Sequence, residues 1–469
     1  MELDPLLLSR IQFAFVVSFH AIFPVFTIGL ATYIAVLESL HYRTGHPDYL
    51  RLSIFWTRVF ALVFGMGVVS GIVMSFQFGT NWSTFSYQAA NFIGPVLSYE
   101  VVTAFFLEAT FLGVLLFGRN KVPPGVHLFA ACMVAIGTFI SSFWILAANS
   151  WMQTPAGVEL VDGTVKITSW GEAIFNASLP YRFAHMGLAS FITGGFVVAG
   201  VSAWYLLRNR HRSTAMTALK MSLPMLAVIT PLQLLVGDLH GLNTLENQPV
   251  KVAAMEGHWE TQQGAPLILF AIPDSSAEEN HLEVAIPYLG SLILTHSLDG
   301  EVLGLKSVPA EDRPPVGIVF WSFRVMVGLG MIFIGVSLLG AMQLLRGRLE
   351  HSPRLLRVIS WMIPLPFMAV LAGWFVTEVG RQPWIIHGLM RTSEGITPSL
   401  SGWMVLATLI GYITVYTIVF AAGLTYLRRV ILAGPEPGPG EHENRSAHAK
   451  RPWSAVGGTS DERPAQERS

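Results

Sequence analysis

The sequence predicts an all-α polytopic membrane protein, with nine transmembrane helices packed as helical bundles. Three observations lead to this fold class. The 469 residues are 52% hydrophobic and only 13% charged, and their mean hydropathy is +0.52, which is typical of chains that are solvated by lipid. Nine apolar segments are long enough to cross a hydrocarbon core ~30 Å thick. Lys and Arg gather in every second connection between these segments.

The nine predicted spans alternate in direction. They cover about 11–38, 53–77, 93–117, 127–149, 183–207, 216–236, 316–345, 358–377 and 402–427. Connections after the odd-numbered spans carry HYRTGHPDYLR, GRNK, RNRHR and RGRLEHSPRLLR, and the ninth span ends in RR. Cytoplasmic loops of membrane proteins are enriched in Lys and Arg. We therefore expect the N-terminus outside and the C-terminus in the cytoplasm.

Two segments are predicted to lie outside the lipid. Residues 237–315 form a long outside connection with twelve acidic residues against Lys251, Lys306 and Arg313. Residues 433–469 are rich in Pro, Gly and charge, which predicts a disordered cytoplasmic tail. The rest, 1–432, is the predicted membrane domain. The first residues, MELDPLLLSRIQ, lack the basic region and cleavage site of a signal peptide, so we expect them in the mature chain.

Composition argues against several other classes of protein. The net charge is −1 and no basic run occurs, so nucleic acid is not an expected partner. The single cysteine, Cys132, lies in an apolar span. It therefore allows neither a disulfide framework nor a cysteine metal cage, and packing is its expected role.

Two carboxylates in the third span require an explanation. Glu100 and Glu108 stand eight residues apart in YEVVTAFFLEA, with no basic residue in the same apolar run. An ionised carboxylate at membrane depth costs a few kcal/mol even on lenient scales, and such residues usually mark a functional site. Glu100 lies about 12 Å from the outer end of its span at 1.5 Å per residue, and Glu108 lies deeper.

Four further side chains fall in the outer half of the predicted bundle. His20 lies midway along the first span, His185 begins the fifth, Met326 lies near the outer end of the seventh, and Glu378 ends the eighth. Each alone has a structural explanation: a hydrogen-bonded histidine, a packing methionine, or an ion pair between Glu378 and Arg381 three residues on. Their convergence on one side of the bundle favours a shared site.

The chemistry of this set favours haem over zinc. Imidazole, thioether and carboxylate without cysteine do not suit a structural zinc site. A His/Met pair suits a six-coordinate haem that transfers electrons, whereas a lone His or Glu suits a five-coordinate haem with one face open to a gas.

The outside connection contains a second candidate site in GDLHGLNTLENQPVKVAAMEGHWET. Lys251 and Glu256 are five residues apart there, and Asp238 lies at the start of the stretch. These residues can be solvated loop charges. Alternatively, a base and an acid just outside a haem-bearing bundle can hydrogen-bond a quinol headgroup and take its protons.

Seven stretches, in this order along the chain, resemble subunit I of the cytochrome bd quinol oxidases: SRIQFAFVVSFHAIFP, SYEVVTAFFLEATFLG, SFWILAANSWMQTPAG, RFAHMGLASFITGG, QPVKVAAMEGHWETQ, FRVMVGLG and GWFVTEVGRQPW. The resemblance covers most of the chain. Residues 263–315 are short, which is similar to the short-loop group that includes the cyanide-insensitive oxidases.

The resemblance implies the iron ligands. His185 and Met326 match the axial ligands of a low-spin haem b. His20 matches a ligand of one of two high-spin haems, a haem b and a haem d, and Glu378 matches the ligand of the other. Which haem each one holds stays open, and a second haem b can replace haem d. Arg324, Arg381 and Trp374 match positions around the haems.

The resemblance also implies the substrate site and the proton route. Lys251 and Glu256 match the pair of the quinol loop, and Glu100 and Glu108 match carboxylates at the high-spin haems and on the route toward them. Thr138, Ser141 and Ser142 of the fourth span can extend this route, or can pack between helices.

The implied function is that of the haem-binding catalytic subunit of a terminal respiratory oxidase in a bacterial cytoplasmic membrane. Such an enzyme oxidises ubiquinol or menaquinol at the outer face and reduces dioxygen to water with cytoplasmic protons, which generates a proton motive force. Expected partners are subunit II, a small single-span accessory subunit and the lipid bilayer. Two other classes stay open at this stage: a haem-bearing anchor that only relays electrons, and a secondary transporter, which also places carboxylates at membrane depth.

Overall fold

The structure is a computed structural model that describes residues 3–435. Within that range, nine helices are long and apolar enough to cross a membrane, which confirms the nine predicted spans. Seven spans consist of one continuous helix each: α1 (Pro5–Thr44), α2 (Pro47–Thr80), α6 (Pro124–Gln153), α8 (Leu179–Leu207), α9 (Arg212–Asn247), α12 (Val316–Leu345) and α15 (Gly402–Ala433).

The third and eighth spans are interrupted helices. The third consists of α4 (Ala90–Glu100), a π-helical segment η1 (Val101–Phe105) and α5 (Phe106–Phe117). The eighth consists of α13 (Pro353–Trp361) and α14 (Leu365–Val379), separated near Pro364. Proline has no N–H to donate and its ring clashes with the preceding turn, which explains the second interruption.

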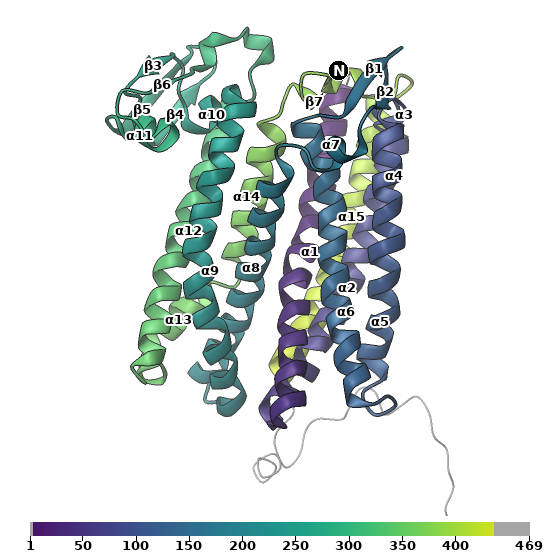
Figure 1. The fold of residues 1–469 in the computed structure, drawn as a ribbon, viewed down its shortest axis with the longest axis vertical. Helices are drawn as coiled ribbons and strands as arrows, with labels where there is room; N and C mark the ends of the chain where they lie inside the picture. The colour runs from purple at the N-terminus through teal and green to yellow at the C-terminus, as the bar shows by residue number, and fades with distance from the viewer. Residues whose placement is uncertain (1–2, 436–469) are drawn as a thin grey trace, which may run out of the picture. The chain divides into compact units, whose positions relative to one another are not determined.

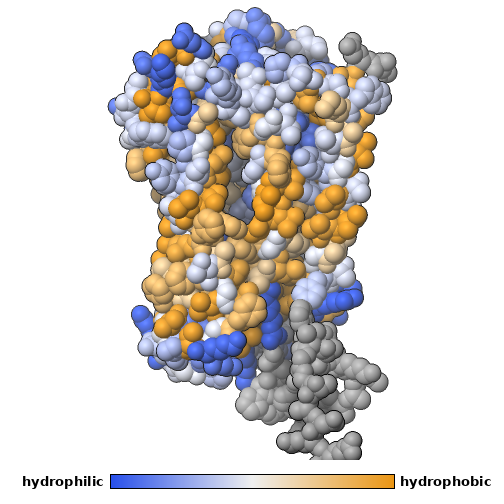
Figure 2. Space-filling model, turned by 90° about the vertical axis from the view of Figure 1, so that its right-hand side faces the viewer, coloured by the Kyte–Doolittle hydropathy of each residue, from blue (hydrophilic) through white to orange (hydrophobic). Residues whose placement is uncertain are grey.

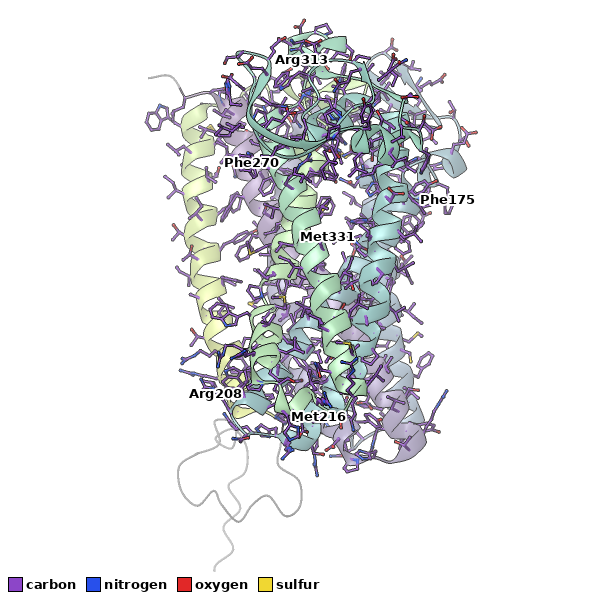
Figure 3. All side chains as sticks on the ribbon, turned by 90° about the vertical axis from the view of Figure 1, so that its left-hand side faces the viewer. Phe175, Arg208, Met216, Phe270, Arg313 and Met331 are labelled. Atoms are coloured by element: carbon purple, nitrogen blue, oxygen red, sulfur yellow. The ribbon has the colours of Figure 1, made fainter. Side chains whose placement is uncertain are left out.

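The described residues have two distinct ends (Figure 1). The N-terminal residues, the helix α10 (Pro249–Glu256) and the short strands lie at one end, which is called the outer end below after the predicted topology, while the turns α1–α2, α5–α6 and α8–α9 lie at the other. Figure 3 places Phe270 and Arg313 at the first end, Arg208 and Met216 at the second, and Met331 between them. A broad apolar band separates the hydrophilic ends on the face shown in Figure 2, as the predicted alternation of spans requires.

The outer connections contain strands that the all-α prediction did not include. The described residues form four two-stranded antiparallel sheets. These are β1 (Val158–Val161) with β2 (Thr164–Ile167), β3 (Gln262–Gln263) with β6 (Glu301–Val302), β4 (Leu267–Asp274) with β5 (Glu279–Ile286), and β7 (Trp384–Ile386) with β8 (Met390–Arg391). Short helices complete these connections: α3 (Ser83–Gln88), α7 (Trp170–Ile174), α11 (Leu289–Thr295), η2 (Leu305–Ser307), η3 (Ala310–Asp312) and η5 (Thr392–Glu394). A further short helix, η4 (Leu349–His351), lies at the opposite end, between α12 and α13.

The predicted start of the outer connection at residue 237 is wrong. The helix α9 continues to Asn247, so Asp238 lies on a helix and the connection begins at Gln248. Hydropathy falls after residue 236 because polar residues follow, but polar side chains do not interrupt backbone hydrogen bonding. The helix ends where Gln248 takes φ −144°, because the residue before a proline disfavours the α region.

The helix α1 has a central place in the packing and contacts α2, α6, α8, α14 and α15. It approaches α8 closely, and a Cβ on Gly29 would lie only 2.2 Å from the carbonyl oxygen of Ser190. Small residues allow this kind of backbone contact between membrane helices. A second group forms around α9, which packs against both α8 and α12.

A buried polar cluster ties the helices together at the cytoplasmic end of the predicted topology. Glu38 of α1 pairs with Arg119, accepts a hydrogen bond from Ser53 of α2, and lies 3.3 Å from Nδ1 of His127 on α6. The second ring nitrogen of His127 lies 3.1 Å from the carbonyl oxygen of Leu115. A buried carboxylate is tolerated when it is paired in this way. The predicted disordered tail falls almost entirely on residues 436–469, which lie outside the described residues.

Candidate functional site

The first candidate pair of iron ligands lies on α8 and α12. The helices α9 and α14 each pack against both of them. A Cβ on Gly237 of α9 would lie 3.4 Å from Cε1 of His185, and a Cβ on Gly373 of α14 would lie 3.0 Å from Sδ of Met326. Nδ1 of His185 is buried without a hydrogen-bond partner among the described residues. The two glycines therefore keep side-chain bulk away from His185 and Met326.

His20 is oriented by its neighbour on α2. Nδ1 of its ring lies 2.9 Å from Oγ of Ser70. The Ser70 hydroxyl also lies 3.0 Å from the carbonyl oxygen of Gly67 and can donate its hydrogen there. With that donation made, Nδ1–H of His20 donates to Oγ and the lone pair is on Nε2, an arrangement in which the second ring nitrogen orients a metal ligand.

The π-helical segment η1 aligns Glu100 and Glu108. In a regular α-helix, eight residues at 100° each leave two side chains about 80° apart. An i→i+5 turn holds one more residue than an α-turn. The eight residues from Glu100 to Glu108 then turn the chain as far as seven residues of a regular α-helix would. The two side chains therefore leave the helix axis in directions only about 20° apart. π-Bulges within α-helices are frequently found at functional sites.

Both carboxylates face the same strip of α6. Ser141 donates a hydrogen bond of 2.7 Å to Oε1 of Glu100. One turn earlier on α6, Gly137 lies so close that an added Cβ would be 2.6 Å from Cγ of Glu108. Oε1 of Glu108 is buried with no hydrogen-bond partner among residues 3–435. Thr138 bonds to the carbonyl oxygen of Ala135 in its own helix, so only Ser141 of the three predicted hydroxyls contacts a carboxylate.

A cavity of about 670 Å³ adjoins this strip. Its lining comes from α1, η1, α6 and α8 and is almost wholly apolar; it includes Thr103, Phe139, Trp144 and Phe183. Trp144 donates a hydrogen bond of 3.0 Å to Thr103, three residues after Glu100. Small-molecule and cofactor sites have volumes of ~300–1,000 Å³ and are mostly apolar. The cavity matches them in size and lining, but it is wide open to the surface and Glu100 is not among its lining residues.

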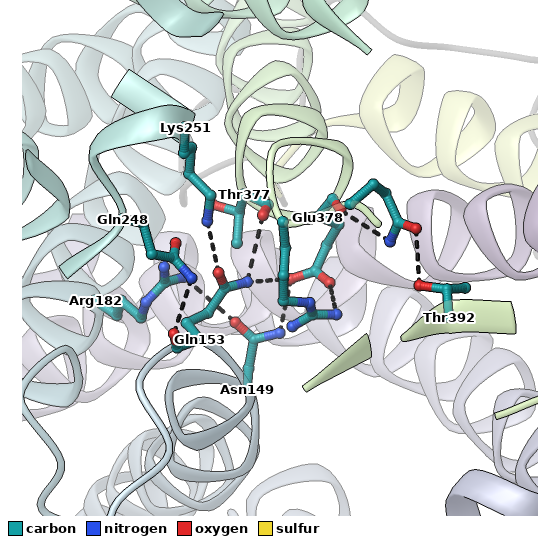
Figure 4. Close-up of polar contacts among 10 residues, drawn as sticks. Asn149, Gln153, Arg182, Gln248, Lys251, Thr377, Glu378 and Thr392 are labelled. Carbon is teal, nitrogen blue, oxygen red and sulfur yellow. Dashed lines mark hydrogen bonds and ion pairs between the residues drawn. The ribbon is translucent and has the colours of Figure 1, made fainter. Parts of the chain in front are cut away.

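Glu378 is the centre of a hydrogen-bond network at the outer end (Figure 4). Arg381 donates to its Oε2 at 2.5 Å, and Asn149 of α6 donates to its Oε1 at 2.9 Å. Gln153, also on α6, lies 3.4 Å from the same Oε1. The expected i,i+3 ion pair is thus present, but it is one part of a larger, partly buried network.

Several buried donors near Glu378 have no partner among the described residues. They are Nε and Nη1 of Arg381, Nε of Arg182 and Nε1 of Trp374. An unpaired buried donor costs about 1–3 kcal/mol, so this set fits an additional anionic group. Haem carries two propionates, and guanidinium groups bind carboxylates through paired N–H donors. In the part of the chain described, no three His, Cys, Asp or Glu side chains are placed to hold a metal ion by themselves.

Lys251 and Glu256 lie on the short helix α10, and both are buried, with 4% and 6% of their surface exposed. They are therefore not solvated loop charges. Five residues at about 100° each put them about 140° apart around the helix. Lys251 donates a hydrogen bond of 2.6 Å to Oε1 of Gln153. Burial, and then the positive charges of Arg182 and Arg381, hold the pKa of Lys251 well below its usual range.

Glu256 faces a different set of groups. It pairs with Arg324 of α12 at 2.9 Å, and Arg324 also donates to the carbonyl oxygens of Met255 and Ile268. Arg324 therefore anchors the outer connection. Asp238 lies on the exposed surface of α9, and the structure does not bring it into hydrogen-bonding contact with Lys251 or Glu256 within residues 3–435.

Sequence reasoning missed Gln153, Asn149 and Arg182. Asn149 and Gln153 both donate to Glu378, and Gln153 also accepts from Lys251. Arg182 joins the same network by donating to Asn149 at 3.4 Å. The available signal was the run NSWMQ at the outer end of the fourth span, where polar residues follow an apolar helix.

The nine long apolar helices among the described residues define a multi-pass membrane protein. A family model described as cytochrome bd terminal oxidase subunit I matches residues 8–435. The chain belongs to this family.

Relatives and a solved structure agree with this assignment. Cytochrome bd-II ubiquinol oxidase subunit 1 of Escherichia coli (strain K12) is 34% identical over 92% of this chain and 97% of its own length. Cytochrome bd ubiquinol oxidase subunit 1 of Bacillus subtilis (strain 168) is 36% identical over 92% of this chain and 95% of its own length. A chain of the bd oxidase from Geobacillus thermodenitrificans superposes with a TM-score of 0.84 at 32% identity, covering 92% of this chain and all of that one.

Proposed function

We propose that this chain is the haem-binding catalytic subunit of a terminal oxidase that takes electrons from quinol at the outer face and reduces dioxygen to water with cytoplasmic protons. The observation that carries this proposal is the set of unpaired buried donors of Arg381, Arg182 and Trp374 around Glu378. Such a set suits the propionates of a haem whose iron a nearby carboxylate can bind. The resulting movement of charge across the membrane would make the enzyme electrogenic.

The proposed cofactors are two haem b and one haem d, or a third haem b in place of haem d. His185 and Met326 would bind the low-spin haem, while His20 and Glu378 would each bind one high-spin haem. Bound haems supply one-electron carriers and an iron that dioxygen can reach. The protein's own contribution is to set each ligand: Ser70 fixes the tautomer of His20, and Asn149 and Arg381 orient the carboxylate of Glu378.

Quinol is proposed to bind at the outer connection beside α10. Lys251 is buried and its pKa is lowered, so its amine can hydrogen-bond a quinol oxygen or take its proton. Glu256 would act from the opposite face of α10, where Arg324 holds it. Asp238 would contribute only from the exposed side of α9.

Protons for water formation are proposed to move from the cytoplasm past Glu108 to Glu100. The π-helical segment puts both carboxylates toward α6, and Ser141 holds Glu100 there. A buried carboxyl group without partners, such as Oε1 of Glu108, can receive and release a proton at one site.

The assembly is proposed to lie in a bacterial cytoplasmic membrane, with the N-terminus outside. Its partners would be subunit II and a small single-span subunit, and its substrates would be dioxygen and either ubiquinol or menaquinol. Residues 1–432 would form the membrane domain and residues 433–469 the cytoplasmic tail.

A spectrum of the purified oxidase tests the proposal. Reduced-minus-oxidised difference spectra with pyridine haemochrome analysis should show three haems per complex. His185→Ala should remove the low-spin bands, and His20→Ala should remove high-spin bands together with quinol-dependent oxygen uptake. If oxygen uptake and the high-spin bands survive His20→Ala, the protein is an electron relay and not the oxidase. A preparation without haem would favour a transporter.

A further inference from the structure

A second cavity, of about 210 Å³, lies at the outer end between α10 and the β7–β8 hairpin. Charged and aromatic side chains from three separate segments line it, among them Lys251, Asp312, Arg381, Trp384 and His387. It is smaller than the ~300–1,000 Å³ of sites that enclose whole drug-sized ligands. It therefore suits a single ring with polar substituents. Glu256 is not among its lining residues, because Glu256 faces Arg324 on the other side of α10.

His387 is held in this cavity by its backbone. It follows β7 in the hairpin turn, and its N–H donates to the carbonyl oxygen of Met152 at 2.9 Å. The next residue, Gly388, has φ +69°, which permits the tight return to β8. The imidazole makes no hydrogen bond to any other described residue, and its Nδ1 is fully buried. Nε2 is thus the nitrogen that a ligand in the cavity can reach.

The surroundings keep this imidazole neutral near pH 7. Burial, followed by the charges of Lys251 and Arg381, lowers the pKa of His387 to about 4. Asp312 from η3 is the acidic residue that lines the cavity, and it is already paired with Arg391 of β8. Arg391 in turn stacks on the ring of Trp384 at 4.9 Å. The neutral imidazole is therefore free to accept a hydrogen bond or a proton.

We propose that this cavity takes the headgroup of the quinol, with Lys251 bound to one oxygen and His387 accepting the proton of a phenolic hydroxyl. This inference rests on the proposed function and adds a residue to it. Sequence spacing paired Lys251 with Glu256, whereas the folded chain pairs Lys251 with an imidazole 136 positions further along. In the step, one quinol O–H bond breaks and an N–H bond forms on His387, and the proton of the second hydroxyl passes to the amine of Lys251, whose pKa is lowered. The two electrons would be accepted by the haems of the oxidase, and both protons are released to water outside.

The test compares His387→Gln with His296→Gln in the purified two-subunit oxidase. His296 is an exposed histidine in the same outer connection and lies outside the cavity. Oxygen uptake is measured with a short-chain quinol over a range of pH. Loss of a proton acceptor reduces rates by at least about 100-fold, so kcat/KM of His387→Gln should fall by that order and its optimum should move to higher pH. His296→Gln should match the wild type.

Haem content and reduction by dithionite provide the structural control, and both should be unchanged in His387→Gln. If this variant does not assemble, His387→Asn is measured in the same way. The inference is overturned if kcat/KM and the pH profile stay at wild-type values while Lys251→Gln raises KM, and the proposed function then still stands. If the wild-type oxidase lacks haem and quinol-dependent oxygen uptake, the proposed function itself fails.

Discussion

Gly137→Ala should damage the contact between α6 and the buried Glu108. The added Cβ would lie 2.6 Å from Cγ of Glu108 and 3.5 Å from its Cδ. Carbon atoms prefer separations of about 3.5–4.0 Å, so the overlap with Cγ approaches 1 Å. Cγ is close to the backbone, and the side chain must change its χ1 angle or the helices must separate. Overpacking of this kind costs about 1–3 kcal/mol.

A matched control is available on the facing helix. Gly113 of α5 has no heavy atom within 4 Å of the position of an added Cβ. Alanine is favoured over glycine in a helix by about 1 kcal/mol, so Gly113→Ala should leave the midpoint of thermal unfolding unchanged or raise it. Gly137→Ala should lower this midpoint, and it should slow oxygen uptake without changing KM for quinol.

A double-mutant cycle identifies the contact. Glu108→Ala removes Cγ, so Gly137→Ala added to that variant should cost nothing further or should stabilise it slightly. Circular dichroism in detergent measures the thermal unfolding of the wild type, the two single variants and the double variant. Coupling between residues in contact typically amounts to about 0.5–3 kcal/mol. An equal loss from Gly137→Ala in both backgrounds would refute the packing argument.

Three further predictions concern the outer half of the protein. Ser70→Ala removes the partner of Nδ1 of His20; it should lower stability by about 1–3 kcal/mol and broaden the high-spin haem bands, whereas Ser70→Thr should retain them. Arg381→Lys keeps a charge beside Glu378 but loses the guanidinium donors, and pyridine haemochrome analysis should show less haem per protein than in the wild type. The pKa of His387 is lowered from 6.5 to about 4, so the unfolded chain binds more protons in this interval and stability should fall as pH drops from 6.5 toward 4. His387→Gln should show a smaller fall in its melting temperature, and an identical pH dependence in both proteins would contradict this.

Much of the fold could be predicted from the sequence because a lipid bilayer constrains the length of each span and the placement of charged residues. Apolar length predicted the nine spans, and the distribution of Lys and Arg predicted that they alternate. Hydropathy could not show that α9 continues to Asn247, because a helix persists through polar residues until backbone geometry ends it. Nor could it predict the small sheets, whose strands are short and lie in the outer connections.

The sequence indicated which residues belong to the candidate site, but it did not indicate which of them contact one another. Glu100 and Glu108 stood out because charge is costly at membrane depth. Their alignment depends on one π-helical turn, and spacing in a sequence does not reveal such a turn. Lys251 and Glu256 were found together but face apart, because five residues span about 140° of a helix. Gln153 was not selected as a candidate because its amide carries no charge, and an uncharged polar residue at a helix end is common.

That amide gives the link between Lys251 and Glu378 a direction. The oxygen of Gln153 accepts a hydrogen bond from Nζ of Lys251, and its nitrogen donates to the carboxylate of Glu378. Rotating the amide by 180° would set donor against donor and acceptor against acceptor, so the order of the three side chains cannot be reversed. A carboxylate at position 153 would repel Glu378, and an ammonium group would offer Lys251 no acceptor. A side chain with a donor and an acceptor at one tip makes both contacts, so Gln153 sets the order in which Lys251 and Glu378 are linked.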